Sequence, residues 1–204
     1  KLGGERVLIF VDGSASMLAD NVVNAIIRRN MDIQQRQSAP KWLWTMNTVE
    51  WLLAQLPASS RFQLYIFNTS VSAAVNGTDG EWLDAADSLS VERAVEGLRA
   101  FAPAAGTSLE NAVVSINDFD KSPDNIFILT DGLPTQGARA PSSSMVDGDQ
   151  RRKNFQNAIK KIPNGIPVNT ILFPMEGDPE AAALFWQLAL NTQGAFIAPS
   201  RDWP

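Results

Sequence analysis

The chain has 204 residues, 45% of them hydrophobic, so it is long enough to bury a full core. Its net charge is −5 and it carries no basic–aromatic block, so nucleic-acid binding is not expected. Cysteine and histidine are both absent, which excludes disulfides, thiolate chemistry, Ser-His-Asp hydrolysis and His-based zinc sites. No apolar run is long enough to cross a membrane.

Strand-like and helix-like segments alternate along the chain. The strand-like segments are short, apolar and rich in branched residues, as in strands buried on both faces. They are residues 6–11, 61–67, 71–75, 125–130, 168–173 and 195–198. The helical patterns lie between them, at residues 41–56, 91–101, 108–119, 150–162 and 179–190. This alternation predicts an α/β fold with a mostly parallel sheet covered by helices on both faces.

No internal repeat or linker divides the chain, so we expect one domain over residues 1–204. Two segments read as additions to it. Residues 18–40 predict an inserted helix (19–33) followed by a polar turn (34–40), and residues 133–148 form a loop rich in Pro, Gly and Ser. Both additions follow the end of a predicted strand, so both are expected beside any ligand bound at that edge of the sheet.

Hydroxyl and carboxylate side chains gather at three points of the predicted fold. The turn Asp12-Gly13-Ser14-Ala15-Ser16 follows the first strand, Thr107 precedes a helix, and Asp131 follows the strand 125–130. Hard oxygen donors of this kind suit Mg²⁺, Mn²⁺ or Ca²⁺ and are poor ligands for copper or zinc. A cation held by three hydroxyls and only two carboxylates would keep its electrophilic character and one open coordination position.

Each segment also has a simpler interpretation. Asp12 alone reads as a helix cap, Thr107 as an N-cap for the following helix, and Asp131-Gly132 as a turn. The combination of all three segments favours the cation site, and a residue can both cap a helix and bind a metal.

Together these segments resemble the metal-ion-dependent adhesion site (MIDAS) of von Willebrand factor type A (vWA) domains, over about residues 6–198. All five motif positions are matched, by Asp12, Ser14, Ser16, Thr107 and Asp131. The resemblance implies a Rossmann-like, doubly wound, mostly parallel six-stranded sheet with one short antiparallel edge strand, for which residues 71–75 are the candidate. It also implies Mg²⁺ (or Mn²⁺ or Ca²⁺) and a partner protein whose Asp or Glu completes the coordination. The segment 18–40 departs from many members of the family, in which the first helix follows the turn almost at once.

The predicted function is therefore metal-dependent protein binding or adhesion, without catalysis. A metal-assisted phosphoryl transferase or hydrolase would need a general base, and the chain offers no credible one. A dinucleotide fold would need G-x-G-x-x-G after the first strand, where D-G-S-A-S stands. The remaining alternative is a scaffold subunit with a structural metal, assembling through residues 18–40 or through Trp44 and Trp51.

The location is predicted from the resemblance and from the start of the chain. Because the chain begins at Lys1 rather than Met, we expect a processed or excised piece. With the absence of cysteine and the family resemblance, this favours a bacterial periplasmic or cell-surface location, tethered to the membrane by an upstream segment. Cytoplasmic relatives that work with ATPase motor subunits are the alternative.

Overall fold

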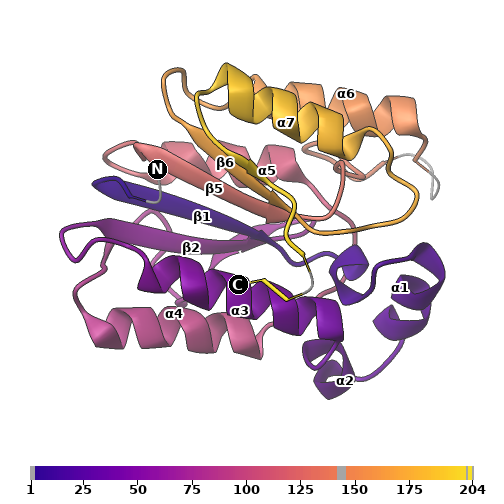
Figure 1. Cartoon of the computed structure of the whole chain (residues 1–204), viewed down its shortest axis with the longest axis horizontal. Coiled ribbons are helices and arrows are strands. Elements are labelled where there is room, and N and C mark those ends of the chain that lie inside the picture. The colour runs from indigo at the N-terminus through magenta and orange to yellow at the C-terminus, as the bar shows by residue number, and fades with distance from the viewer. Residues whose placement is uncertain (1–2, 142–145, 201, 204) are drawn as a thin grey trace.

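A mostly parallel sheet forms the centre of the molecule (Figure 1). The computed structural model describes residues 3–141, 146–200 and 202–203, and over these the sheet has seven strands in the order β3-β2-β1-β5-β6-β7, with β4 also paired to β2. The strands are β1 (Arg6–Asp12), β2 (Arg61–Phe67), β3 (Val71–Ala73), β4 (Leu83–Asp84), β5 (Asn125–Thr130), β6 (Val168–Leu172) and β7 (Phe196–Ile197). Strands β2, β1, β5, β6 and β7 are parallel, which confirms the predicted α/β architecture.

Both faces of the sheet are covered by helices. Packed against one face are α3 (Pro40–Ala54) and α4 (Ser88–Ala100), and against the other α5 (Leu109–Val114), α6 (Gly148–Ile159) and α7 (Ala181–Asn191) (Figure 1). Short 3₁₀ turns follow β1 and α5, at η1 (Ala15–Leu18) and η2 (Ser115–Asp118). This two-sided cover explains why apolar residues follow one another in β1 and β5 instead of standing at alternate positions.

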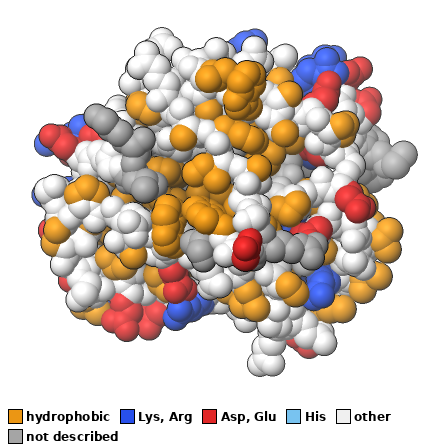
Figure 2. Space-filling view, in the orientation of Figure 1, with side chains coloured by type: hydrophobic (Ala, Val, Ile, Leu, Met, Phe, Trp, Pro, Cys, Tyr) orange, Lys and Arg blue, Asp and Glu red, His pale blue; other side chains and the backbone are white. Residues whose placement is uncertain are grey.

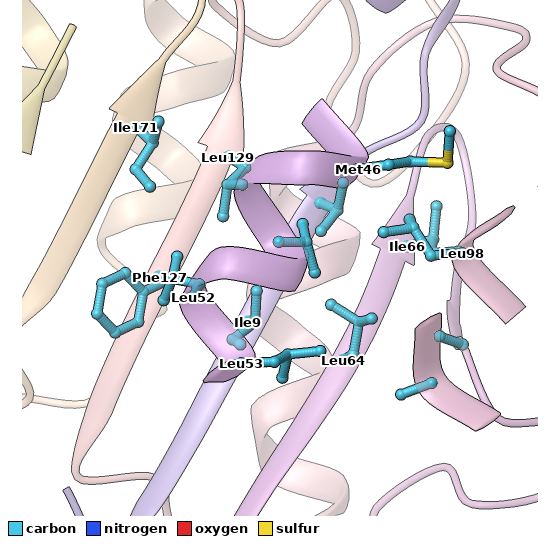
Figure 3. Close-up of a cluster of buried hydrophobic side chains, with 14 of the residues drawn as sticks. Ile9, Met46, Leu52, Leu53, Leu64, Ile66, Leu98, Phe127, Leu129 and Ile171 are labelled. Atoms are coloured by element: carbon cyan, nitrogen blue, oxygen red, sulfur yellow. The ribbon is translucent and has the colours of Figure 1, made fainter. Parts of the chain in front are cut away.

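Alternate residues of β1 belong to two separate cores. Ile9 points to the α3 side, where it packs with Leu52 and Leu53 of that helix and with Leu64 of β2 (Figure 3). Phe10 points to the other side, into the cluster covered by α5, α6 and α7. Because strand side chains alternate with a period of two, one buried strand serves both clusters.

The predicted antiparallel edge strand at residues 71–75 is confirmed as β3, which pairs antiparallel with β2. The sheet has one strand more than the six expected, because the two residues of β4 also pair antiparallel with β2. That pairing is too short to have a sequence pattern of its own, so no periodicity could have indicated it.

The segment 18–40 differs from its prediction of one long helix and a turn. It forms two short helices, α1 (Val22–Arg29) and α2 (Ile33–Gln37), beyond the carboxyl ends of β1 and β2 (Figure 1). The chain leaves α1 at Asn30 and restarts at Asp32, whose carboxylate accepts the Gln35 amide while the Gln35 side chain accepts the Asp32 amide. This reciprocal cap starts a new helix at Ile33, so the helical pattern of residues 19–33 is divided between two helices.

Helix α1 carries apolar side chains into solvent. Val22, Val23, Ile26 and Ile27 are 45–67% exposed, and Ala25 is the buried residue of this helix. Figure 2 shows hydrophobic side chains at the surface over the region that α1 occupies in Figure 1. The helix therefore turns its apolar side outward.

Trp44 and Trp51, a suggested assembly surface, pack against the chain itself. Trp44 lies edge-on to Phe173 with ring centroids 5.0 Å apart, and its indole N–H donates to the Trp203 carbonyl at 2.5 Å. Trp51 contacts the Trp203 ring at 4.9 Å. Trp203 thus packs against Trp44 and Trp51 of α3.

Ile9 gives a small test of this core. It is fully buried between α3 and the sheet, so Ile9→Val should lower the free energy of unfolding by about 1 kcal/mol through the loss of one packed methyl group. Urea denaturation measures the change. Val23→Ala, which shortens a 67% exposed side chain, should change stability by less than about 0.5 kcal/mol. Equal effects at the two positions would contradict the packing described here.

Candidate metal centre

The turn after β1 closes around the Asp12 carboxylate. Asp12 is the last residue of the strand and is fully buried, and its Oδ1 accepts the Ser14 amide at 2.9 Å. A side chain at position 13 would meet the Phe101 ring at 2.5 Å, so glycine is required there. The tight turn therefore brings the side chains of Asp12, Ser14 and Ser16 close to one another.

Backbone hydrogen bonds fasten the other two segments to this turn. The Ala15 amide donates to the Ala105 carbonyl at 3.0 Å, and the Ala104 amide donates to the Gly13 carbonyl at 2.9 Å. The loop that carries Thr107 is bonded in turn to the chain beyond Asp131. There the Thr107 amide donates to Thr135 Oγ1 at 2.9 Å and the Thr107 carbonyl accepts the Gln136 amide at 3.0 Å.

The side chains of the turn and of Asp131 form one hydrogen-bonded chain. Ser14 Oγ and Ser16 Oγ are 2.9 Å apart, and Ser16 Oγ donates to Asp131 Oδ1 at 2.8 Å. Asp131 is 4% exposed, Ser14 1% and Thr107 5%, whereas Ser16 is partly exposed. The structure thus joins Asp12, Ser14, Ser16 and Asp131 through direct hydrogen bonds and fastens the loop before Thr107 to the same turn.

The buried Asp12 carboxyl is costly to ionise in this arrangement. Burial, and then the negative charge of Asp131, raise the pKa of Asp12 from 3.8 to about 7, although hydrogen bonds from Thr130 and Ser14 oppose the shift. A buried carboxylate under these conditions is stabilised by a nearby cation.

Two residues of the site were missed in the sequence. The Thr130 hydroxyl donates to Asp12 Oδ2 at 2.7 Å, and the buried Lys41 ammonium donates to Asp131 Oδ2 at 2.6 Å. Thr130 looks like an ordinary strand residue. One feature of the sequence could have indicated Lys41. It lies in the first turn of α3, where the helix dipole disfavours a positive charge unless an acidic group compensates it.

A second ion pair closes the site on the side of the loop 133–148. Asp178 Oδ2 accepts from Arg151 at 2.7 Å and from the Leu133 amide at 2.6 Å, and a side chain at Gly132 would meet Asp178 at 2.7 Å. Residues 142–145 of that predicted loop lie outside the described residues, and α6 begins at Gly148. Glycine at 132 therefore lets Asp178 approach the chain beside Asp131.

A pocket of about 480 Å³ adjoins the other side of the site. It lies between α1, η1 and the start of α3, and its lining includes Asn24, Arg28, Lys41 and Trp44. One wall of the pocket is thus the same lysine that contacts Asp131.

The donors fit a hard divalent cation. Within the part of the chain that the structure describes, no group of three or more His, Cys, Asp or Glu side chains could hold a metal, so any ion here would depend on hydroxyls. Two carboxylates and three hydroxyls form an all-oxygen set that matches the preferences of Mg²⁺ and Mn²⁺. The raised pKa of Asp12 is a second sign of fit, since a cation would compensate that charge.

Comparisons with known proteins find relatives in structure only. No family model matches the chain, and no curated protein is detectably similar to it in sequence. A von Willebrand factor type A structure from Catenulispora acidiphila matches 98% of this chain at 16% identity and a TM-score of 0.67, and this chain covers 39% of its length.

Two further structures are similar. An aerotolerance-related membrane protein from Bacteroides fragilis, with multiple mutations to serines, matches 97% of this chain at 16% identity and a TM-score of 0.55, with 92% of its own length covered. Proximal thread matrix protein 1 from the mussel byssus, with a zinc-occupied MIDAS motif, matches 96% of this chain at 13% identity and a TM-score of 0.53, with 43% covered. These likenesses establish a vWA-type fold.

The described residues contain no helix that is long and apolar enough to cross a membrane.

Proposed function

We propose that this chain is a protein-interaction module in which a divalent cation, Mg²⁺ by preference, binds Asp12, Ser14, Ser16, Thr107 and Asp131. When bound, the ion supplies an electrophilic site for an Asp or Glu carboxylate of a partner protein. The observation that carries the proposal is the convergence of two buried carboxylates with the hydroxyls of Ser14 and Ser16. A carboxylate on a divalent ion in a partly dry site is strongly attracted, so one contact can dominate binding.

The surroundings support a binding site rather than a catalytic one. Asp12 accepts hydrogen bonds from Ser14 and Thr130, and both oxygens of Asp131 also accept hydrogen bonds. With all four oxygens engaged, both carboxylates would serve the ion, and the chain has no histidine to act as a general base. Ser16 is partly exposed, which gives a ligand from outside a way to reach the ion.

The proposed location is outside the cytoplasm, in a bacterial periplasm or on a cell surface. The support comes from the structural neighbours, which include a membrane protein from Bacteroides fragilis and a matrix protein of the mussel byssus. This chain covers 39% of the length of the Catenulispora acidiphila structure, so an activity or partner in common with such larger proteins is a proposal.

Selection from a library of displayed random peptides tests the proposal without knowledge of the partner. Peptides retained in Mg²⁺ should be enriched in Asp or Glu and should be released by EDTA, because the acidic side chain binds the ion rather than the protein. Isothermal titration of one selected peptide in Mg²⁺ and in EDTA measures the difference. Peptides that bind equally well in EDTA would refute a metal-bridged contact.

A matched variant assigns the effect to this site. Thr107→Val keeps the side-chain volume and the amide bonded to Thr135 but removes one proposed ligand oxygen, so it should weaken both metal and peptide binding. Thr69→Val, in the neighbouring loop between β2 and β3, makes the same chemical change outside the five positions and should have little effect.

A scaffold role is the second candidate, and the exposed apolar side of α1 favours it. In that case the metal is structural, so EDTA should lower the melting temperature while assembly stays intact. Size-exclusion chromatography in EDTA and in Mg²⁺ separates the two functions.

A further inference from the structure

Lys41 is a fixed positive charge inside the proposed metal site. Its ammonium donates to Asp131 Oδ2 at 2.6 Å, to the Ala19 carbonyl at 3.0 Å and to the Ser16 carbonyl at 3.3 Å. The side chain is 2% exposed. The Met175 Sδ lies 3.9 Å from the same nitrogen. Three oxygen acceptors, one for each ammonium proton, thus surround the nitrogen and hold the lysine in position.

The lysine changes the charge of the site at every stage. When Asp12 is ionised, Asp12 and Asp131 contribute −2 and Lys41 contributes +1, so the site without metal then carries −1. A divalent ion brings it to +1, whereas the same site without the lysine would become neutral. An ion bound by Asp131 and Ser16 must share both residues with the ammonium, because Lys41 donates to Asp131 Oδ2 and to the Ser16 carbonyl. The other oxygen of Asp131, Oδ1, accepts the Ser16 hydroxyl.

We propose that Lys41 couples metal binding to anion binding. The lysine lowers the affinity of the site for a divalent ion alone, and it increases the factor by which a bound carboxylate raises that affinity. This inference rests on the proposed function and specifies its regulation. The metal-loaded site carries an excess positive charge in a buried setting, and an incoming carboxylate neutralises it. By thermodynamic reciprocity, a bound carboxylate raises the affinity for the metal by the same factor by which the bound metal raises the affinity for the carboxylate. The module would then hold its ion firmly only when an acidic partner is present.

Lys41→Met tests the coupling, because methionine keeps the length of the side chain and removes its charge. Mn²⁺ is the metal probe, since its free form is quantified by electron paramagnetic resonance, and acetate is the carboxylate probe. At one fixed pH, Lys41→Met should bind Mn²⁺ alone about tenfold or more tightly than the wild type. Acetate should tighten Mn²⁺ several-fold in the wild type and by a clearly smaller factor in the variant.

Lys153→Met is the matched control, since Lys153 is an exposed residue of α6 and loses the same charge. It should reproduce the wild-type affinities and the acetate effect, which also corrects for acetate that binds free Mn²⁺. If Lys41→Met fails to fold, Lys41→Gln replaces it, because glutamine is also uncharged and keeps a polar N–H group in the buried position.

The outcomes separate this inference from the proposed function. Mn²⁺ affinity that is unchanged or weaker in Lys41→Met would overturn the coupling and leave the metal site standing. Absence of Mn²⁺ binding in the wild type and in both lysine variants would overturn both proposals. Tighter Mn²⁺ binding with an undiminished acetate effect would also reject the coupling, because the lysine would then act on the metal alone.

Discussion

Asp12→Asn is expected to weaken Mn²⁺ binding by roughly 100-fold or more while stabilising the metal-free protein. The amide keeps the shape of the side chain, and its oxygen can still accept the Ser14 amide. Its nitrogen can donate to Thr130, whose hydroxyl proton can turn to the Gly132 carbonyl, 3.4 Å away. The variant therefore removes the buried charge and leaves the turn intact, so metal affinity and stability should change in opposite directions.

Titration with Mn²⁺ and urea denaturation in EDTA measure the two effects. Asp120→Asn, an exposed residue in the loop before β5, makes the same chemical change and should alter neither quantity. A loss of stability in Asp12→Asn would mean that Asp12 supports the fold as a charged group, and unchanged Mn²⁺ affinity would remove it from the metal site.

Stability of the metal-free protein should fall as the pH rises from about 4 to about 7, by up to roughly 4 kcal/mol from Asp12. The pKa of this carboxyl is raised from 3.8 to about 7 by burial and by Asp131, so the folded state keeps a proton that the unfolded chain releases. This contribution is complete below pH 4 and is lost as the pH approaches 7. Mg²⁺ should reverse the trend, because it binds the ionised form of the folded state alone.

Urea denaturation over this pH range, in EDTA and in excess Mg²⁺, gives both curves. Other carboxyl groups also titrate in the lower part of the range, so the difference between wild type and Asp12→Asn isolates Asp12. Equal pH slopes for the two proteins in EDTA would contradict the raised pKa. A Mg²⁺ curve parallel to the EDTA curve would show that the ion does not act at this carboxylate.

The fold was predictable because its signals are local. Consecutive apolar residues, as at positions 126–129, indicate strands covered on both faces, and their alternation with amphipathic helices indicates a parallel sheet. The edge strand β3 follows from the short turn after β2. The break between α1 and α2 was not predicted, because the cap formed by Asp32 and Gln35 competes with a helical pattern that continues across it.

Much of the candidate site was also visible in the chain by itself. The five oxygen-bearing residues stand at the ends of predicted elements, and parallel strands bring such ends to one edge. Residue type and position relative to a strand therefore indicate these five side chains as candidate ligands. Nothing in that pattern distinguishes a carboxylate in water from one that is fully buried, as Asp12 is.

Only the tertiary structure decided the charge around these oxygens and which other residues contact them. Lys41 and Asp131 are 90 residues apart in the chain, and Thr130 and Asp12 are 118 apart, so neither contact leaves a periodic trace. Burial and charge compensation depend on how α3 lies against the ends of β1 and β5, which is settled by packing of the whole core. The sequence by itself thus determined an oxygen-rich edge on a parallel sheet, whereas the structure determined that this edge already contains one cation of its own.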